Sequence, residues 1–245
     1  MSEGPDSTLS RLLRERRSTR DFKPDPVPDT VLEAILADAC QAPSWSNSQP
    51  YKLAIATGAL RDRLSREYCE AFDASLAALA KGWRGRLRLA LGGAGRPDGD
   101  FDTHFPYPEE LAPRRRATGF GLYKLLGIAR EDMGARNRQM RRNFEFFGAP
   151  TVLFFFVHRG LREFSVLDAG ILLQSVMLSA QARGLATCAQ GALATWAGPP
   201  RRAFGVPPHY GLICGLSIGY ASDAPVNAFN PGREHPAALR LAPRA

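Results

Sequence analysis

The sequence predicts an α+β fold in which helices form layers around a small sheet. Two patterns indicate this class. Several segments repeat apolar residues at helical spacing, whereas residues 151–157 (TVLFFFV) form the continuous apolar, β-rich run typical of a strand covered on both faces. A chain of 245 residues can bury one substantial core, so we expect a single domain over 1–245.

The first half of the chain predicts three helices and a strand before a long irregular region. The expected elements are a helix from Ser7 or Thr8 to Arg17, a helix over 30–40, a strand over 51–56 and a helix over 60–80. Ser7 is expected to cap the first helix. Residues 82–118 are dense in glycine and proline and predict a surface excursion without regular elements, of the kind used by lids and binding loops. Short helices are expected to resume near 120–126 and 132–147.

The second half is more regular. After the strand at 151–157 we expect a helix over 164–183, a strand-like stretch over 184–190, a short helix over 200–204 and a strand over 211–220. Apolar residues cover most of the circumference of the 164–183 helix, and a helix that is apolar all round must be enclosed. A subunit interface would enclose it, and the alternative is a central helix of a monomer.

Composition and motifs narrow the class of protein. The formal charge is +8, yet the basic residues are scattered and no nucleic-acid-reading motif accompanies them, so we expect no nucleic-acid partner. The four cysteines lack metal-binding spacing and are expected to be buried, reduced thiols, with no metal site. The N-terminus is polar, and the longest apolar stretch is interrupted by Asp168, Gln174 and Gln181. We therefore expect a cytoplasmic protein without a membrane span.

The chemistry is expected to reside in a cofactor. The sequence contains no nucleophile elbow, Walker loop or metal-spaced histidine pair, and its four histidines lack motif context. At the end of the first helix, Arg16 and Arg20 could converge on a dianion with the Ser18 hydroxyl between them, because guanidinium groups and neutral donors suit phosphate. The alternative is that these arginines merely complement the helix dipole.

Three further segments fit a flavin. The polar loop 42–50 carries Asn47 and Gln49, whose carboxamides complement the alternating donors and acceptors of a flavin's pyrimidine edge, although such a loop could also simply cap a helix. In 184–192, Gly191 would allow the backbone to approach the ring closely. The segment 219–233 ends in Arg233, which would return another guanidinium to the phosphate.

These segments together resemble the nitroreductase (NAD(P)H:FMN oxidoreductase) family. The resemblance is carried by RRSTRDF at 16–22, APSWSNSQPY at 42–51, DAGILLQSVMLSAQARGLATCAQGAL at 168–193 and GLSIGYASDAPVNAF at 215–229. It implies a central, mainly antiparallel sheet flanked by helices, in an intertwined homodimer with FMN at the subunit interface. The apolar 164–183 helix would then form the dimer core.

The resemblance also implies a set of cofactor-binding residues. The ribityl phosphate would be bound in one subunit by Arg16, Arg17, Ser18 and Arg20, to which Arg233 would be added. The other subunit would supply the polar loop, with Pro43, Ser44, Trp45 and Asn47 and with Gln49 nearby. The flavin ring would lie against Gln190 and Gly191. Many relatives have glycine at the position of Trp45, so an indole would narrow the substrate cavity or stack on the substrate. Asn230 stands where a basic residue is frequent. No catalytic side chain is assigned.

The implied activity is ping-pong hydride transfer from NADH or NADPH through FMN to a nitroaromatic, a quinone or a similar electron-poor small molecule. A second hypothesis is a flavoenzyme of the same fold with another reaction, such as enone reduction, dehydrogenation or dehalogenation. A third is a non-enzymatic module that grips an anionic partner with the basic runs at 84–88 and 114–116.

Overall fold

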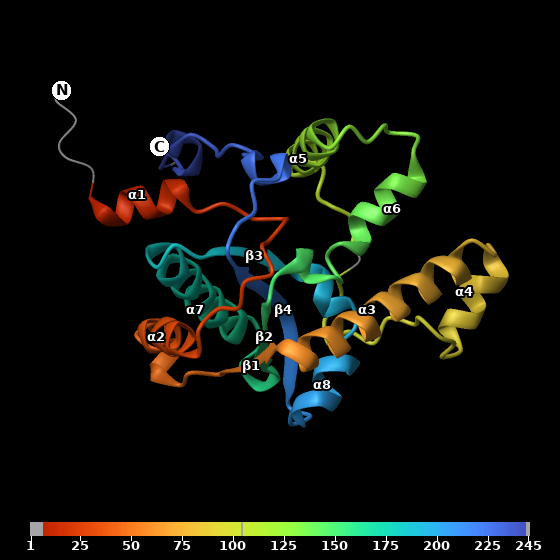
Figure 1. Ribbon diagram of the computed structural model, residues 1–245, viewed down its shortest axis with the longest axis horizontal. Coiled ribbons are helices and arrows are strands. Elements are labelled where there is room, and N and C mark those ends of the chain that lie inside the picture. The colour runs from red at the N-terminus through yellow and green to blue at the C-terminus, as the bar shows by residue number, and fades with distance from the viewer. Residues whose placement is uncertain (1–6, 104, 244–245) are drawn as a thin grey trace.

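The computed structural model describes residues 7–103 and 105–243, arranged as helices around one sheet (Figure 1). The α-helices are α1 (Thr8–Glu15), α2 (Asp29–Ala39), α3 (Gly58–Leu79), α4 (Trp83–Ala90), α5 (Ala112–Leu125), α6 (Met133–Arg141), α7 (Arg162–Ala182) and α8 (Gly198–Phe204). The strands are β1 (Tyr51–Thr57), β2 (Thr151–His158), β3 (Ala186–Gln190) and β4 (Tyr210–Gly219). Short 3-10 turns at Trp45–Asn47, Phe146–Gly148 and Pro225–Ala228 lie near the candidate site.

The sheet is antiparallel, as the family resemblance implies. Its strand order is β1-β2-β4-β3, so β1 and β3 form its two edges. In the central strand β2, all residues from Thr151 to Val157 are buried, which confirms a strand covered on both faces. Side chains alternate along the strand: Phe154 and Phe156 enter one apolar cluster, and Leu153 and Phe155 enter the other.

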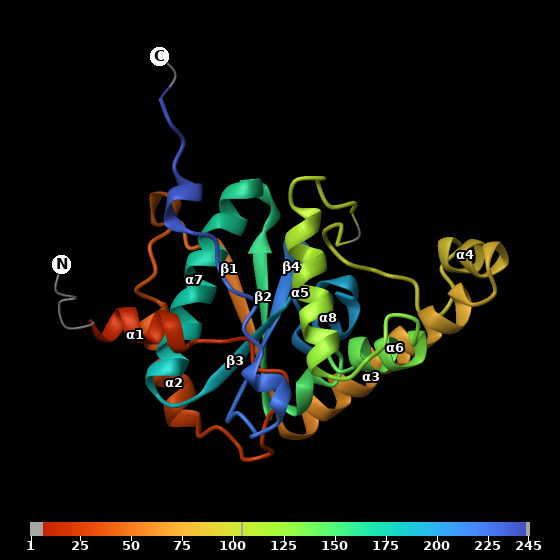
Figure 2. The same ribbon diagram turned by 90° about the horizontal axis from the view of Figure 1, so that it is seen from above.

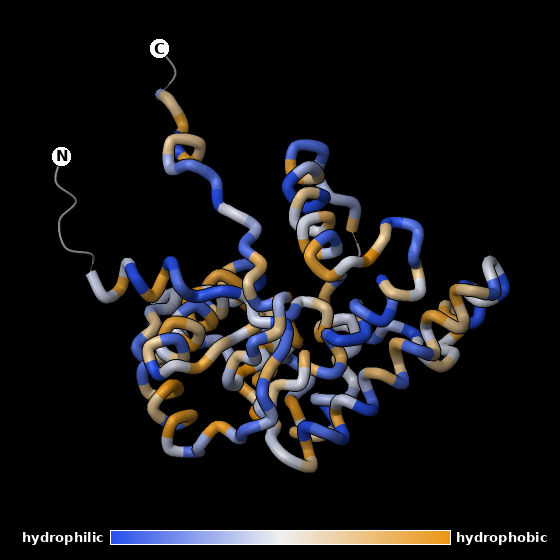
Figure 3. Tube along the Cα trace, turned by 45° about the horizontal axis from the view of Figure 1, so that its top comes forward, coloured by the Kyte–Doolittle hydropathy of each residue, from blue (hydrophilic) through white to orange (hydrophobic). Residues whose placement is uncertain are grey.

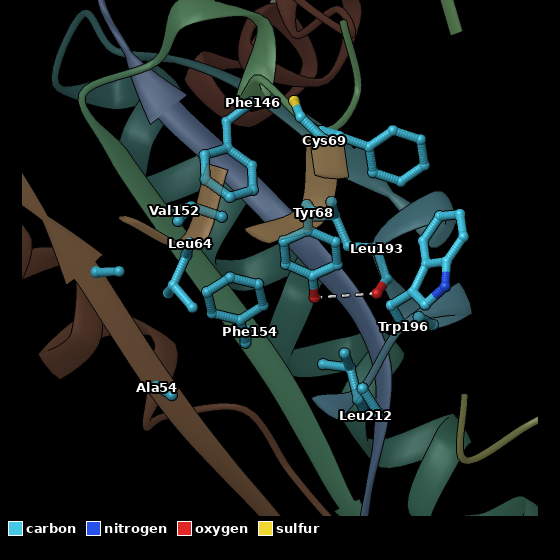
Figure 4. Close-up of a cluster of buried hydrophobic side chains, with 14 of the residues drawn as sticks. Ala54, Leu64, Tyr68, Cys69, Phe146, Val152, Phe154, Leu193, Trp196 and Leu212 are labelled. Atoms are coloured by element: carbon cyan, nitrogen blue, oxygen red, sulfur yellow. Dashed lines mark hydrogen bonds between the residues drawn. The ribbon is translucent and has the colours of Figure 1, made fainter. Parts of the chain in front are cut away.

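Helices cover both faces of this sheet (Figure 2). On one face, α3 and α8 close over a cluster in which Tyr68, Phe154 and Leu193 are fully buried, and the Tyr68 hydroxyl donates to the Leu193 carbonyl at 3.1 Å (Figure 4). On the other face, α2 and α7 pack together over Leu153 and Phe155. The predicted α+β layering is therefore confirmed.

The irregular region predicted at 82–118 contains two helical stretches, and that part of the prediction is wrong. α4 begins at Trp83, and its Gly85 lies so close to α3 that an added Cβ would be 1.6 Å from the Ala78 carbonyl oxygen. α5 begins at Ala112, and Pro113 lies in its first turn. Proline favours a helix there, because an N–H in the first turn has no acceptor within the helix and the fixed φ of proline suits the helix. Pro113 is one of the prolines whose density predicted an irregular region.

The middle of the same region is anchored to the sheet. The side chain of Asp100 is 7% exposed; its carboxylate pairs with Arg201 at 2.7 Å, accepts the Leu212 N–H at 2.7 Å and contacts Arg159. The chain around residue 100 is therefore a fixed strap across the end of β4.

Helix boundaries elsewhere differ from the prediction for local reasons. Ser7 caps α1 as expected, accepting the Ser10 N–H at 3.1 Å. α1 ends at Glu15 rather than Arg17, because Arg16 leaves the helical region at ψ 122° and the chain becomes extended. The helix expected over 132–147 ends at Arg141, and Phe146 and Phe147 both have φ 54° in the turn before β2.

Helix α7 is not enclosed within one chain. One face is buried against β2, β3 and α2, but Phe164, Val166 and Leu167 on the other are 44%, 37% and 58% exposed. By length and composition alone Arg159–Ala182 could also cross a membrane, with a mean hydropathy of 1.3; core helices of globular proteins can pass the same test. Its packing on the sheet and the burial of Asp168 within it favour a core helix.

Candidate functional site

A pocket of about 360 Å³ lies where the start of the chain meets its C-terminal segment. It is lined by Leu13, Arg14, Arg16, Arg17, Ser18, Arg20, Phe229, Asn230, Pro231, Gly232 and Arg233. Five of these residues are the predicted phosphate ligands, namely Ser18 and the four arginines Arg16, Arg17, Arg20 and Arg233, which we call the pocket arginines. The structure brings the N-terminal and C-terminal parts of the predicted phosphate site to one pocket.

Backbone pairing with β3 places the N-terminal part of this pocket. After α1, the extended chain runs beside the edge strand, with Ser18 bridged to Thr187 and the Thr19 N–H donating to the Thr187 carbonyl at 3.0 Å. Three residues further on, Phe22 is bridged to Ala221 beyond the end of β4. The segment that carries the arginines is therefore held between a sheet edge and the C-terminal part of the chain.

Asn227 joins the C-terminal part of the chain to the arginine segment by hydrogen bonds, a role that its sequence context did not indicate. Its Oδ1 accepts the Arg20 N–H at 2.8 Å and the Asp21 N–H at 3.2 Å, and its Nδ2 donates to the Asp21 carbonyl at 2.8 Å. One carboxamide thus satisfies three main-chain groups of the arginine segment. The signal in the sequence was only an asparagine after a proline turn, which is common in loops.

Besides Arg233, whose Nη1 donates to the neighbouring Gly232 carbonyl at 2.5 Å, two of the pocket arginines bond to the backbone around the pocket. Arg17 Nη1 donates to the Ala228 carbonyl at 3.4 Å, and Arg20 Nη1 donates to the Ser18 carbonyl at 3.2 Å. The guanidinium carbon of Arg20 also lies 6.0 Å from the centre of the Phe229 ring. Because a guanidinium has five N–H donors, these contacts orient the two groups and leave donors for a ligand.

No acidic residue lines this pocket in the part of the chain that the structure describes. Within residues 7–103 and 105–243, no carboxylate forms an ion pair with any of the pocket arginines, whereas Arg142 pairs with Asp21 at 2.8 Å. The pKa of Arg16 is lowered, first by burial and second by the nearby charge of Arg233. Two guanidiniums that repel each other in a half-buried pocket favour an anion between them.

The polar loop predicted to bind the flavin lies at the other edge of the sheet. It directly precedes β1, whereas the arginine segment pairs with β3. Three strand spacings of about 4.8 Å separate these edges by roughly 14 Å. Consistently, none of Pro43, Ser44, Trp45, Asn47 and Gln49 lines the arginine pocket. One chain does not bring the two half-sites together.

The loop itself is tightly constrained. Ser46, Asn47 and Gln49 have φ values of 50°, 54° and 47°, a left-handed conformation that costs non-glycine residues free energy and is frequent at binding sites. The Ser44 hydroxyl accepts the Gln49 N–H at 3.0 Å, and Gln49 Nε2 donates to Asn47 Oδ1 at 3.1 Å. Asn47 and Gln49 nevertheless remain exposed, so their remaining polar atoms face solvent.

Asp168 anchors this loop to α7, and the sequence analysis missed its role. Its side chain is 2% exposed, and each carboxylate oxygen lies 3.1 Å from the Trp45 N–H. The Trp45 ring in turn lies 4.2 Å from the Phe164 ring, measured between centroids. An ionisable residue within a strongly apolar helix was the available signal, but it was interpreted only as evidence against a membrane span.

In the 184–192 segment Gly191 is exposed, whereas the side chain of Gln190 is buried. Gln190 is 2% exposed; its Nε2 donates to the Asn143 carbonyl at 2.7 Å, and the Ser217 hydroxyl donates to its Oε1 at 2.6 Å. Gly191 is exposed, with open space where a Cβ would lie. Any contact of Gln190 with a ligand would therefore involve its main chain.

The cysteines only partly match the expectation of buried thiols. Cys69 and Cys188 are buried and Cys214 is half-buried, but Cys40 is exposed at the end of α2, where the prediction is wrong. Burial raises the pKa of Cys188 to about 11, an effect that Arg20 and Arg16 partly oppose. Cys188 therefore lies beneath the arginine pocket as a neutral thiol.

Comparison with known proteins gives a consistent result. The model of the nitroreductase family matches residues 13–220. The chain is 34% identical over 210 residues to a 4-nitrobenzoate reductase of Nocardioides sp. (strain LMS-CY), covering 85% of this chain and 78% of that protein.

Solved structures agree with this result. The FMN-dependent nitroreductase NfnB of Mycobacterium smegmatis, crystallised in complex with NADPH, has a TM-score of 0.81 at 32% identity, over 96% of this chain and 97% of that chain. The FMN- and NADPH-dependent NfnB of Sphigopyxis sp. strain HMH also has a TM-score of 0.81, at 31% identity over 98% of this chain and 100% of that chain. On the family match and these likenesses, the chain belongs to the nitroreductase family.

Proposed function

We propose that this protein is an FMN-dependent oxidoreductase that passes electrons from NAD(P)H to nitroaromatic compounds, quinones or similar electron-poor small molecules. The observation that carries the proposal is the pocket that the four pocket arginines line from both ends of the chain, and that no acidic residue lines within 7–103 and 105–243. Such a pocket suits a phosphate dianion, and the related NfnB structures are those of FMN-dependent enzymes. The chemistry of the donor set therefore fits the phosphate of FMN.

The residues of this chain divide into two groups around that cofactor. Arg16, Arg17, Ser18, Arg20 and Arg233 would hold the phosphate, and Gly191, with open space beside its backbone, would allow the isoalloxazine ring to lie close to the chain. Main-chain atoms of Gln190 would contribute beside it. When bound, FMN supplies the hydride chemistry of both halves of a ping-pong cycle.

The second group reaches the cofactor from a partner subunit. The loop with Pro43, Ser44, Trp45, Asn47 and Gln49 lies across the sheet from the arginine pocket, so a homodimer is the simplest way to join the two half-sites. The exposed apolar face of α7 supplies a surface for that dimer, because exposed contiguous apolar patches mark interaction sites. Each of the two sites would then combine an arginine pocket and a partner's loop.

Residues of this chain bind and orient rather than transfer protons in this proposal. Among the residues that the structure describes, no histidine, acidic residue or cysteine lines the arginine pocket, and solvent can supply the protons that reduction of the acceptor requires. Trp45, 54% exposed at the tip of its turn, would narrow the acceptor cavity and stack on an aromatic substrate. The relatives act on small nitroaromatics, and we expect the same substrate class in a cytoplasmic enzyme.

A spectrum and a turnover assay test the proposal. We expect the purified protein to be yellow, with flavin absorption, and to oxidise NADH or NADPH when 4-nitrobenzoate or a quinone is added. Removal of the flavin should abolish turnover, and added FMN should restore it. Turnover that persists without flavin would end the proposal, and a flavin-loaded protein inactive on all nitro compounds and quinones would favour an enone reductase, dehydrogenase or dehalogenase of the same fold.

A further inference from the structure

Three pockets adjoin one another along the C-terminal segment and α5. The arginine pocket shares Pro231, Gly232 and Arg233 with a second pocket of about 470 Å³, which also contains Arg114, Ala117, Thr118 and Glu234. The second pocket shares Arg114 and Thr118 with a third of about 370 Å³, completed by Tyr107, Leu111 and Arg115. Because these pockets share lining residues they adjoin one another, and we call them together the groove; of the residues that line its second and third parts, only Arg233 is also assigned to the proposed FMN site.

Close packing joins α5 to the arginine pocket. Gly121 of α5 lies so near Phe229 that an added Cβ would be 3.0 Å from the phenyl Cε2 atom, and Phe229 lines the arginine pocket. α5 and the segment after Phe229 project from the same side of the body (Figures 2 and 3). The groove therefore runs outward from the FMN phosphate pocket between these two projecting segments.

The second pocket has the chemistry of an anion site. Arg233 of the C-terminal segment and Arg114 of α5 both line it, and so does Thr118, a residue whose hydroxyl is a neutral donor. Glu234 pairs with Arg114 at 2.8 Å between exposed side chains, which orients the guanidinium but offsets part of its charge. Two guanidiniums and one carboxylate leave a net positive charge, so the pocket suits a second phosphate weakly rather than a cation.

The third pocket has the chemistry of a base-stacking site. The Arg115 guanidinium carbon lies 4.7 Å from the centre of the Tyr107 ring, and Leu111 adds an apolar wall. A planar aromatic base can stack on a tyrosine ring or on a guanidinium plane. A planar base and an anionic group, held in adjoining pockets, are the two recognisable parts of a phosphorylated nucleoside.

We propose that the second and third pockets bind the adenosine 2′-phosphate half of NADPH, so that Arg114 and Arg115 make the enzyme prefer NADPH over NADH. This inference rests on the proposed function, because the groove starts at the FMN phosphate pocket. The 2′-phosphate occupies the second pocket between Arg114 and Arg233, and the adenine lies against Tyr107 and Arg115. NADH has no 2′-phosphate and so gains nothing from the second pocket.

A binding experiment with the flavin-loaded protein tests the groove without turnover. Calorimetry with 2′,5′-ADP, and with 5′-ADP for comparison, measures the contribution of the 2′-phosphate. We expect 2′,5′-ADP to bind more tightly than 5′-ADP, and Arg114→Ala and Arg115→Ala each to weaken 2′,5′-ADP binding about tenfold. Arg130→Ala is the matched control, because Arg130 also stacks on a ring (Phe120, 5.6 Å) but lines none of the three pockets.

Glu234→Gln should change the affinity for 2′,5′-ADP in the opposite direction to Arg114→Ala. Removing this carboxylate relieves repulsion of the 2′-phosphate, so 2′,5′-ADP should bind about two- to fivefold more tightly while 5′-ADP changes less. A purely structural role of the Arg114–Glu234 pair predicts instead that both variants weaken binding. Weaker 2′,5′-ADP binding in Glu234→Gln, or equal binding of the two nucleotides to the unmodified protein, overturns the assignment of the second pocket.

Turnover separates failure of this inference from failure of the proposed function. The ratio of kcat/KM for NADPH to that for NADH should fall about tenfold in Arg114→Ala and should not change in Arg130→Ala. An active enzyme whose ratio is the same in Arg114→Ala refutes the groove alone. A protein that oxidises neither nucleotide refutes the proposed function, and the 2′,5′-ADP measurements then still decide whether the groove binds a 2′-phosphate.

Discussion

Arg16 and Arg233 come from opposite ends of the chain, and their mutual repulsion is the main electrostatic feature of the candidate site. The pKa of Arg16 is lowered by burial and by Arg233, which means that its charged form is disfavoured in the pocket without a ligand. A bound phosphate would reverse this effect by placing negative charge between the two groups. Flavin binding should therefore stabilise this part of the protein, by linkage.

Arg20 provides the direct test of the phosphate pocket. Arg20→Ala should weaken FMN binding by about 1–3 kcal/mol, the usual scale for losing a hydrogen bond to a charged group, because its backbone contacts hold the guanidinium at the pocket. Titration of flavin fluorescence with apoprotein measures the change. Arg63→Ala, which removes an exposed arginine near Glu67, is the control, and equal flavin affinity in Arg20→Ala and Arg63→Ala contradicts the assignment.

Asp168 positions the polar loop 42–50, which we propose faces the flavin. Its buried carboxylate accepts the Trp45 N–H with both oxygens, at the start of a turn whose backbone is left-handed at Ser46 and Asn47. A loop with so many unfavourable φ values needs such an anchor to keep one conformation. One buried carboxylate therefore fixes the geometry of a loop that, in the proposed function, shapes the substrate cavity.

Asp168→Asn should loosen this loop. The carboxamide offers one acceptor oxygen and a buried NH₂ group, so the free energy of unfolding should fall by about 1–3 kcal/mol and FMN affinity should fall with it. Urea denaturation and flavin titration measure the two effects. Asp38→Asn is a matched control, since Asp38 bonds to Ser179 and Arg183 of the same helix but is exposed and distant from the loop. Unaltered flavin affinity in Asp168→Asn would show that Trp45 is not positioned through this bond.

Helix α7 has two apolar faces, and only one of them is covered within a single chain. Leu172 and Val176 pack against the sheet, whereas Phe164, Val166 and Leu167 are exposed in a single chain. A helix with no wide polar face is stable in water only when both faces are covered. In the proposed homodimer the second face is covered by a partner subunit.

A charge on the exposed apolar face of α7 should dissociate the proposed dimer. Leu167→Glu places a carboxylate on the proposed interface, where burying it unpaired is costly, and we expect the mass in solution to fall by half, as measured by light scattering. Flavin should be lost together with the dimer, because in the proposed homodimer each site includes a partner's loop. Leu79→Glu, at a similarly exposed leucine at the end of α3, should leave the mass unchanged. A dimeric Leu167→Glu variant would place the interface elsewhere.

Two thiols make the stability of the fold sensitive to alkaline pH. Burial raises the pKa of Cys188 to about 11 and that of Cys214 to about 12, from an ordinary value of 9.0. The folded protein therefore retains both protons in a range where the unfolded chain has lost them. Their contribution is fully present below pH 9.0 and is lost as pH rises toward the folded-state values.

Urea denaturation across alkaline pH should reveal this loss. Between about pH 9 and about pH 11, each thiol should lower the free energy of unfolding by about 1.4 kcal/mol per pH unit. A Cys188→Ala, Cys214→Ala double variant should lose that part of the slope, whereas Cys40→Ala should keep it, because Cys40 is exposed. If the double variant and the unmodified protein have the same slope, the thiols are not the cause.

Patterns local in the sequence predicted the parts of the fold that depend on local physics. The buried strand β2 was recognisable because seven consecutive apolar or β-branched residues suit only a strand covered on both faces. Ser7 was recognisable as a cap because a hydroxyl before a helix satisfies a free N–H. α4 and the start of α5 were missed, because Gly85 and Pro113 have helix-compatible roles that depend on packing and on position within the turn.

The segment 16–20 could be recognised from the sequence as a candidate phosphate site, because it carries guanidinium groups and a hydroxyl close together, and the structure brings it to one pocket with Arg233. The roles of Asp168, Asn227 and the Gln190 carboxamide were decided only in three dimensions, since each bonds to groups dozens to hundreds of residues away. The same holds for the separation of the two half-sites, because strand order, and not sequence distance, sets which edges of a sheet lie apart.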